Sequence, residues 1–211
     1  MEPDDQSRSA RKRRQIVAAA TEVFLRHGYR GTSMDEIAAL AQVSKQTVYK
    51  HFADKEQLFT HIVLGTTGQV DQMVQMVAGA LTETTDLDQD LRVLARRFLV
   101  TLMRPELLQL RRLVLAEADR FPEVGTAWYE HGFERVLTTL ATCFGQLANR
   151  GLLCNLGDPL LAANHFVGML LWIPVNRVMF CGRDELYSQA ELERLADAAV
   201  TAFLAAHAPK S

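Results

Sequence analysis

Apolar residues recur at helical spacing along almost the whole chain, and no stretch of useful length alternates apolar and polar residues as a strand would. Near the N-terminus, for example, one helical face carries Ile16, Ala20, Val23 and Phe24. The pattern predicts an all-α fold of about nine helices. With 211 residues, of which 48% are apolar, the chain is long enough for one large or two small domains with a hydrophobic core.

Helix ends and capping residues indicate three helices in the first quarter of the chain, the second and third of them short. The first helix is expected to end near Gly28. Ser33 precedes Glu36 by three residues, a capping-box pattern that opens a second helix. Ser44 can cap a third helix over residues 45–51. We therefore expect three helices joined by tight turns.

The rest of the chain predicts longer helices. Asp54 can cap a fourth helix that runs on towards Leu81. Ser188 and Glu191 form a second capping box, which opens the last helix. Pro174 lies inside an apolar segment and is expected to kink or divide the helix there.

Charge is unevenly distributed along the chain, although the net charge is only −2. Between residues 7 and 55 there are ten Lys or Arg against four Asp or Glu, a local charge of +6. From residue 60 onward there are 13 basic and 17 acidic residues. A basic N-terminal quarter on a mildly acidic body suggests that one end meets an anionic partner.

Two short helices joined by a tight turn, with polar donors on the second, are typical of a helix-turn-helix, whose second helix enters the major groove of DNA. Val48 and Phe52, four residues apart, supply the buried face of a helix too short to be stable alone. The outward positions then hold Lys45, Gln46, Tyr49 and Lys50. Lysine suits guanine acceptors and glutamine suits adenine, so this face has the chemistry to read base edges.

Residues 16–59, IVAAATEVFLRHGYRGTSMDEIAALAQVSKQTVYKHFADKEQLF, resemble the DNA-binding domain of the TetR/AcrR family of transcriptional repressors. The segment LAEADRFPEVGTAWYEHGFERV and the later HFVGMLL resemble the C-terminal domain of an AefR-like subgroup. The resemblance implies a DNA-binding domain over residues 9–69, with the helix-turn-helix at about 32–51, and an effector-binding and dimerisation domain over residues 70–211. It also implies a ligand-responsive regulator, in first place a repressor, that binds a palindromic operator on double-stranded DNA as a homodimer. Activation stays open.

The resemblance implies a role for each polar residue of this region. Lys45, Gln46 and Lys50 are expected to contact base edges. Contacts to the DNA backbone fall to Ser33, Ser44, Thr47, Tyr49, His51 and Lys55. The basic run at residues 11–14 would approach flanking phosphates or the minor groove. In the alternative interpretation, Tyr49 mainly packs and Lys50 is merely solvated.

The turn itself departs from the family pattern. The family usually has glycine in an AGVS element, whereas this chain has Gln42 between Ala41 and Val43. If the turn requires a left-handed backbone there, a residue with a Cβ costs about 1–2 kcal/mol. We expect this to affect the stability of the turn more than the function.

Two C-terminal segments carry the apolar faces that a twofold dimer would need. The last helix has an apolar stripe of Leu192, Leu195, Ala196, Ala199 and Phe203. The segment 166–172 is apolar nearly all round. A second subunit can cover these faces, and so can the core of the same chain.

The resemblance also places an effector cavity within the C-terminal helices. Aromatic and Met side chains suit an adaptable apolar pocket for an uncharged or weakly polar, drug- or lipid-sized effector, but each can equally be a core residue. The candidates are Leu102, Met103, Leu107, Trp128, Tyr129, His131, Phe144, Phe166, Met169 and Trp172. The response is expected to pass along the long fourth helix.

Other function classes find less support. The sequence has no GxSxG, P-loop or dinucleotide-binding motif, so an all-helical enzyme or a protein-binding scaffold remains an alternative only. His131 and His165 lack metal-ligand spacing, and neither metal nor cofactor is expected. The N-terminus lacks the apolar core of a signal peptide, and the longest apolar run, residues 166–175, is too short to cross a bilayer. With three well-separated cysteines expected to be reduced and buried, the sequence predicts a cytoplasmic protein with no membrane partner.

Overall fold

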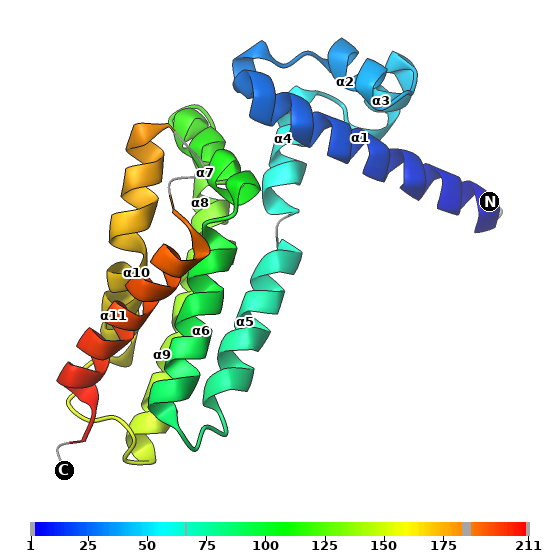
Figure 1. Cartoon of the computed structure of the whole chain (residues 1–211). Helices are drawn as coiled ribbons and strands as arrows, with labels where there is room; N and C mark the ends of the chain where they lie inside the picture. Colours follow the sequence, from blue (N-terminus) through cyan, green and yellow to red (C-terminus); the bar gives the residue numbers. More distant parts are fainter. Residues whose placement is uncertain (1–2, 66, 183–186, 210–211) are drawn as a thin grey trace. The chain divides into compact units, whose positions relative to one another are not determined.

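The computed structural model describes residues 3–65, 67–182 and 187–209, and every element within them is a helix (Figure 1). The predicted all-α fold is therefore confirmed. In chain order the helices are α1 (Pro3–Gly31), α2 (Met34–Leu40), α3 (Lys45–His51), α4 (Lys55–Leu64), α5 (Thr67–Leu81), α6 (Leu87–Leu102), α7 (Pro105–Glu117), α8 (Pro122–Trp128), the π-helical η1 (Tyr129–Glu134), α9 (Arg135–Asn149), α10 (Pro159–Cys181) and α11 (Gln189–His207).

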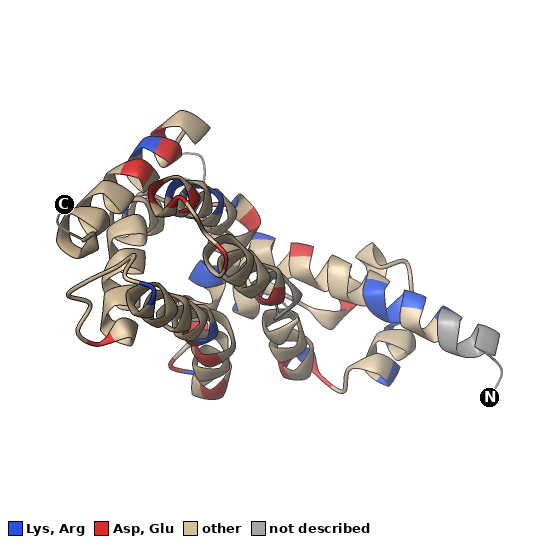
Figure 2. Cartoon of the chain, turned by 90° about the horizontal axis from the view of Figure 1, so that it is seen from below, with Lys and Arg blue, Asp and Glu red and all other residues tan. Residues whose placement is uncertain are grey.

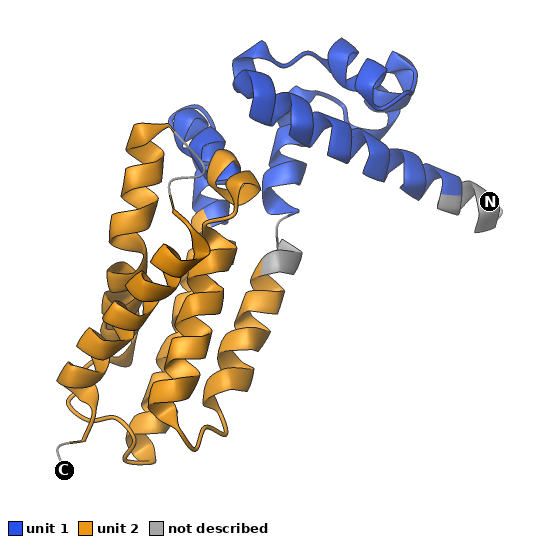
Figure 3. Cartoon of the chain, in the orientation of Figure 1, with its two compact units in different colours: residues 1–66, 110–128 blue, residues 67–109, 129–211 orange. Residues whose placement is uncertain are grey.

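The chain divides into two compact units (Figure 3). Unit 1 comprises residues 1–66 and 110–128, and unit 2 comprises residues 67–109 and 129–211. Unit 1 thus combines α1 to α4 with α8 and most of α7, whereas unit 2 contains α5, α6 and the helices from η1 onward. The functional boundary predicted after residue 69 stays a prediction.

Unit 1 is built around an aromatic cluster. The rings of Phe24, Tyr29, Phe59 and Phe121 lie 4.8 to 5.8 Å apart between centroids. The regular part of α1 breaks at Gly28, whose φ of 69° suits glycine far better than a residue with a Cβ. The predicted end of the first helix is therefore confirmed, and Tyr29 turns into the cluster just beyond it.

Side-chain caps begin the helices where the sequence predicts. Ser33, Ser44 and Asp54 each accept a hydrogen bond from the backbone N–H three residues later, at 3.1, 3.1 and 2.8 Å. Ser188 and Glu191 form the complete capping box at α11. Caps of this kind satisfy N–H groups that a helix start leaves unpaired. They explain why the two seven-residue helices α2 and α3 begin at fixed positions.

The prediction of one helix from Asp54 towards Leu81 is wrong, because α4 ends and α5 begins within that span. Gly65 is the C-cap of α4, and a Cβ at this position would lie only 2.9 Å from the carbonyl oxygen of His61. Residues 65–68 read GTTG. Glycine and threonine are weak helix formers, so this sequence does not sustain a continuous helix.

Unit 2 has its core where α9, α10 and α11 meet. Phe144, Phe166 and Phe203, one from each helix, are fully buried, and their ring centroids lie 4.8 to 5.8 Å apart. The α11 stripe that was a candidate dimer surface faces this core. Its buried members are Leu192, Ala196, Ala199 and Phe203. The buried members of the stripe thus pack within the chain.

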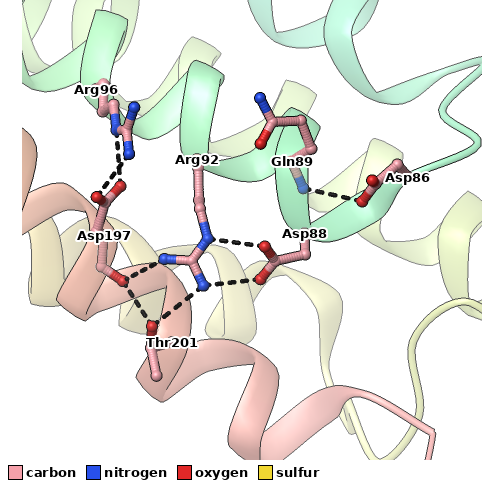
Figure 4. A network of polar contacts seen from close by, with 7 residues as sticks. All are labelled: Asp86, Asp88, Gln89, Arg92, Arg96, Asp197 and Thr201. Carbon is pink, nitrogen blue, oxygen red and sulfur yellow. Dashed lines mark hydrogen bonds and ion pairs between the residues drawn. The ribbon is translucent and has the colours of Figure 1, made fainter.

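A polar network ties α6 to α11 within unit 2 (Figure 4). Arg96 donates two hydrogen bonds of 2.7 Å to the carboxylate of Asp197 and holds its pKa below the usual range. Arg92 donates to Asp88 on its own helix, to the backbone oxygen of Asp197 at 3.2 Å and to Oγ1 of Thr201 at 3.3 Å. The two arginines therefore hold α11 in register with α6.

α10 runs without interruption through Pro174, so the proline does not divide it. Pro174 is buried together with the core residues of the helix, although proline has no backbone N–H to donate. Among the described helices, α10 alone has a length and a mean hydropathy, 1.2, that would suit a membrane span. Core helices of soluble proteins satisfy the same criterion, so this finding is weak evidence for a membrane location.

The three cysteines are free thiols with different exposure. Cys143 is buried, Cys154 is intermediate and Cys181 is exposed. The expectation that all three are buried therefore holds only for Cys143, whose burial raises the pKa of its thiol.

Candidate nucleic-acid interface

The turn between α2 and α3 is a Schellman-type helix end. The N–H of Val43 donates to the oxygen of Ala38 at 3.0 Å, and the N–H of Gln42 donates to the oxygen of Ala39 at 3.1 Å. Gln42 has a left-handed backbone with φ of 54°. Glycine is favoured at this position of the motif because it has no Cβ. The departure from the family pattern thus falls on a strained backbone position.

Gln42→Gly is expected to stabilise the protein by about 1 kcal/mol, which is the left-handed penalty less the extra unfolded-state entropy of glycine. The thermal midpoint should rise by roughly 2–4 °C. Gln42→Ala keeps the Cβ and is the matched control, for which we expect no gain. A lower midpoint for the glycine variant would show that contacts of the glutamine side chain outweigh the backbone strain.

α3 buries one face and exposes the other. Val48 is fully buried and Phe52, its C-cap, is 4% exposed, as predicted. The side chains predicted to face outward are exposed: Lys45, Gln46, Tyr49 and Lys50. Tyr49 has 44% of its surface exposed. This exposure favours a contact role for Tyr49 over a purely packing role.

The hydroxyl-bearing candidates cap helix starts at the surface. Ser44 Oγ accepts from the backbone N–H of Thr47 and lies 2.8 Å from Thr47 Oγ1. Ser33 Oγ accepts from the backbone N–H of Glu36. Ser33 and Ser44 are exposed and Thr47 is half-buried. Because a hydroxyl both donates and accepts, each has capacity for one more partner.

Lys55 is engaged within the protein. Its Nζ donates to the backbone oxygens of Tyr29 and Thr32, both at 2.8 Å, and lies 4.6 Å from the centre of the Tyr29 ring. The guanidinium of Arg120 lies 5.0 Å from the centre of the same ring. Burial, and then the charge of Arg120, lower the pKa of Lys55. Two of its three ammonium protons therefore hold the end of α1 against α4, which leaves one for a DNA phosphate.

Lys55→Ala is expected to destabilise the protein by about 2 kcal/mol, because hydrogen bonds from a charged donor are strong and two carbonyl oxygens lose their partner. The thermal midpoint should fall by roughly 4–8 °C. Lys50→Ala removes an exposed lysine from α3 and should leave the midpoint unchanged. If Lys55→Ala also unfolds at the wild-type midpoint, the lysine does not support the fold, and a direct DNA contact becomes its main role.

Basic residues gather along the N-terminal half of α1, where the ribbon is blue in Figure 2. The run at residues 11–14 is exposed. Arg13 reaches the end of α3 and the middle of α4, with its guanidinium 5.3 Å from the centre of the Phe52 ring and Nη2 3.5 Å from Nδ1 of His61. The surface beside α3 is therefore cationic before any partner binds.

Four of the predicted pocket residues share the core of unit 2. Met103, Phe144 and Phe166 are buried there, and Leu102 packs against them in a partly buried position. Phe144 and Phe166 meet edge to face at 5.8 Å. The structure thus brings these four candidates into one apolar cluster.

The other pocket candidates lie elsewhere. Trp128 packs, partly buried, against the core of unit 1, and Leu107 is half-buried. Tyr129 and His131 are exposed on η1, Met169 is exposed on α10, and Trp172 has 72% of its surface exposed on the same helix. The prediction that Trp172 lines an enclosed apolar pocket is therefore corrected, because its side chain lies on the outer face of α10.

The segment that the sequence shows to be apolar nearly all round lies on α10, and the structure leaves one of its faces exposed. The members of this face recur at helical spacing and are Leu161, Met169, Trp172, Ile173 and Phe180. The spacing was visible in the sequence, but a helix that is apolar nearly all round hides which side stays uncovered. Reasoning from the sequence missed Asp35, whose carboxylate lies 2.7 Å from the ammonium of Lys45.

These features define a class of protein: a small helical unit that presents a polar recognition helix, followed by a larger helical unit. Comparison with known protein families supports this class. Residues 16–62 match the family described as "Bacterial regulatory proteins, tetR family", and residues 89–209 match "AefR-like transcriptional repressor, C-terminal domain". The second match covers more than half of the chain, so this protein belongs to the TetR family of transcriptional regulators.

Known relatives extend the likeness over the whole chain. A TetR-family regulator from Mesorhizobium loti is 55% identical, with a TM-score of 0.88 over 96% of this chain and 99% of that one. The flavonoid-responsive regulator FrrA is 27% identical, with a TM-score of 0.72 over 96% and 100%. The transcriptional activator FasR of Mycolicibacterium smegmatis is 41% identical over 87 residues, 41% of this chain and 38% of FasR. The match to YhgD of Bacillus subtilis covers 27% of that protein. The chain therefore matches well under half the length of FasR and of YhgD.

Membership of this family gives no support to the alternative that the chain is an all-helical enzyme. TetR-family proteins are regulators and generally not enzymes, which agrees with the interpretation of the sequence. Within the described parts of the chain, no group of three or more His, Cys, Asp or Glu side chains is placed to hold a metal ion.

Proposed function

We propose that this chain is a dimeric, ligand-responsive repressor that binds a palindromic operator and is released from it by a small apolar effector. The observation that carries the DNA-binding part is the exposed polar face of α3 above the buried Val48. The match to an AefR-like repressor domain supports repression, while the similarity to the activator FasR favours the opposite sign of regulation. Since an operator lies in the cytoplasm of a bacterium, we expect the protein there.

The proposal gives the residues around α3 distinct roles. Lys45, Gln46 and Lys50 contact base edges. The side chains proposed to contact the DNA backbone are Ser33, Ser44, Thr47, Tyr49 and His51. Lys55 supports them by holding α1 against α4, with one ammonium proton left for a phosphate.

A titration of the protein against DNA from upstream of its own gene, at several salt concentrations, tests this function. Log K should fall linearly with log salt, with a slope of about −0.9 for each phosphate contact. An all-helical enzyme or a protein-binding scaffold predicts no salt-dependent DNA affinity. Failure to bind that DNA and pooled random DNA at low salt would contradict the proposal.

The exposed apolar face of α10 supports the dimer. Trp172 and Phe180 have 72% and 85% of their surface exposed, and two turns of helix separate them. Large exposed apolar patches on soluble proteins mark interaction surfaces. A twofold dimer that buries this face would cover the apolar surface and would present two α3 helices to two half-sites.

The effector site is proposed in the apolar cluster around Phe144 and Phe166. FrrA is described as flavonoid-responsive, which supports an aromatic, weakly polar effector for this chain. To reverse a 99:1 preference for the operator-binding form, the effector has to bind the released form about 10⁴-fold more tightly. Because α4 and α5 are separate helices, the response does not pass along one rigid helix, and α7 and η1 offer two further covalent routes between the units.

Fluorescence of a single tryptophan tests the effector. Trp128→Phe leaves Trp172, on the same helix as Phe166, as the only tryptophan. Flavonoids should change its emission over the same concentration range in which they release the DNA. Operator complexes that resist flavonoids and other apolar molecules of that size would contradict the effector class.

We expect DNA affinity to rise as pH falls from 8 to 6, through His51. Burial, then the charges of Lys50, Arg13 and Lys12, lower its pKa in the free protein. A phosphate beside His51 would favour its charged form, so binding takes up a proton and affinity grows by at most tenfold per pH unit for each subunit. His51→Gln should flatten the dependence, whereas His131→Gln, exposed on η1, should not. Equal pH dependence in both variants would contradict the phosphate contact.

A further inference from the structure

A carboxylate from α2 holds Lys45, the first residue of α3. Nζ of Lys45 lies 2.7 Å from Oδ1 of Asp35, and the two side chains are 58% and 66% exposed. Ion pairs as exposed as this one contribute little to stability. The dipole of α2 does not require Asp35 either, because Glu36 also lies in the first turn and faces His27 at 3.1 Å. Folding alone therefore leaves this ion pair unexplained.

The ion pair gives Lys45 a preferred direction, which a lysine side chain lacks when it contacts a base alone. The ammonium is a point charge on a flexible four-carbon stem, whereas arginine presents a rigid planar fork. Lysine has three donor protons, so one bond to Asp35 leaves two, which matches the O6 and N7 acceptors of guanine. The bond to Asp35 raises the pKa of Lys45 above its ordinary value. The tether favours one direction of the lysine side chain.

The same carboxylate opposes binding to other sequences. DNA phosphates repel Asp35, and Lys45 compensates for this charge only while it stays beside it. On DNA without a guanine at the right place, Lys45 can reach a phosphate only by leaving Asp35 uncompensated. A repulsive element of this kind raises specificity at the expense of general affinity.

We propose that Asp35 is a positioning residue for base recognition, which orients Lys45 towards guanine and weakens binding where no guanine acceptor meets it. This inference rests on the proposed function, in which α3 reads the operator. It assigns to α2 a part in specificity beyond support of the recognition helix.

Asp35→Asn and Glu36→Gln form a matched pair for the test. Both remove one negative charge from the first turn of α2, but only Asp35 contacts Lys45. Each variant is used to select DNA from a random pool, and its affinity for the wild-type site and for a scrambled site is measured at several salt concentrations. Far-UV circular dichroism and the thermal midpoint establish that each variant is folded.

Asp35→Asn should lose about fivefold or more of its base preference at one position in each half-site. Its affinity for the scrambled site should rise, with a salt slope steeper by about 1 per subunit as the freed Lys45 binds phosphate. Glu36→Gln should keep the wild-type preference. In a Lys45→Ala background, Asp35→Asn should change the preference no further.

Undiminished preference at every position in folded Asp35→Asn would overturn the proposal. So would an equal loss in Glu36→Gln, because the effect would then come from charge in general. If Asp35→Asn does not fold, Asp35→Glu replaces it, because this variant keeps the charge and lengthens the side chain. It should weaken the base preference at the same position of the half-site. An unchanged preference in this variant would also overturn the proposal. A wild-type protein that selects no site at all would refute the proposed function itself, before any variant is compared.

Discussion

Trp172→Glu should convert the protein from a dimer to a monomer and lower operator affinity by about 100-fold or more, because linked half-site binding is lost. Trp172 has 72% of its surface exposed within the chain, so a charge there should leave the subunit folded. Analytical ultracentrifugation at micromolar concentration gives the oligomeric state, and a titration of operator DNA gives the affinity. The thermal midpoint of the monomer need not match that of the dimer.

Two control variants make this result specific. Leu115→Glu places the same charge on another exposed apolar residue, on α7, and should keep both the dimer and the affinity. Ala199→Glu alters the buried α11 stripe and should unfold unit 2 before it reports on any interface. A Trp172→Glu variant that remains a dimer with full affinity would show that the exposed face of α10 is not the interface.

Lys45→Ala and Gln46→Ala should relax the sequence preference of the protein, each at its own position in the half-site. The expected loss of discrimination is about 5- to 150-fold per position, as for a well-placed side chain on a base edge. Arg14→Ala, in the exposed basic run of α1, should instead weaken binding to all sequences and reduce the salt slope by about 1 per subunit. Competition between single-base variants of the selected site measures both effects.

The assignment of these roles depends on the contrast between the two kinds of variant. Uniform weakening by Lys45→Ala and Gln46→Ala, with the same preferred site as the wild type, would make both side chains phosphate contacts. A change of preferred site in Arg14→Ala would extend base reading to the N-terminal half of α1.

Local features of the fold were predictable from the sequence. The cap at Ser44 and the buried pair Val48 and Phe52 are set within a few residues, and they place α3 correctly at Lys45–His51. The glycine that the family usually has in the turn raised the question of a left-handed backbone at Gln42, and the structure has one there. Short-range chemistry decides such features, so a single sequence carries them.

Features that depend on neighbours far along the chain were not predictable. Periodicity found an apolar stripe on α11, but it could not tell that α6 and α10, with Phe144 of α9, cover the stripe, or which face of α10 stays uncovered. The helical periodicity of the apolar residues also continues through Gly65, although α4 ends there. The contact of Asp35 with Lys45 spans the turn between two helices, and no local pattern in either helix indicates it.

Selection of bound DNA from a random pool by the unmodified protein tests the central claim most directly. The account predicts an enriched palindrome whose half-sites are centred about one turn of DNA apart, or a multiple of it. Affinity for this palindrome should fall steeply with salt. A pool that yields no enriched sequence, or one unrepeated half-site bound by a monomer, would contradict a dimeric, sequence-specific regulator.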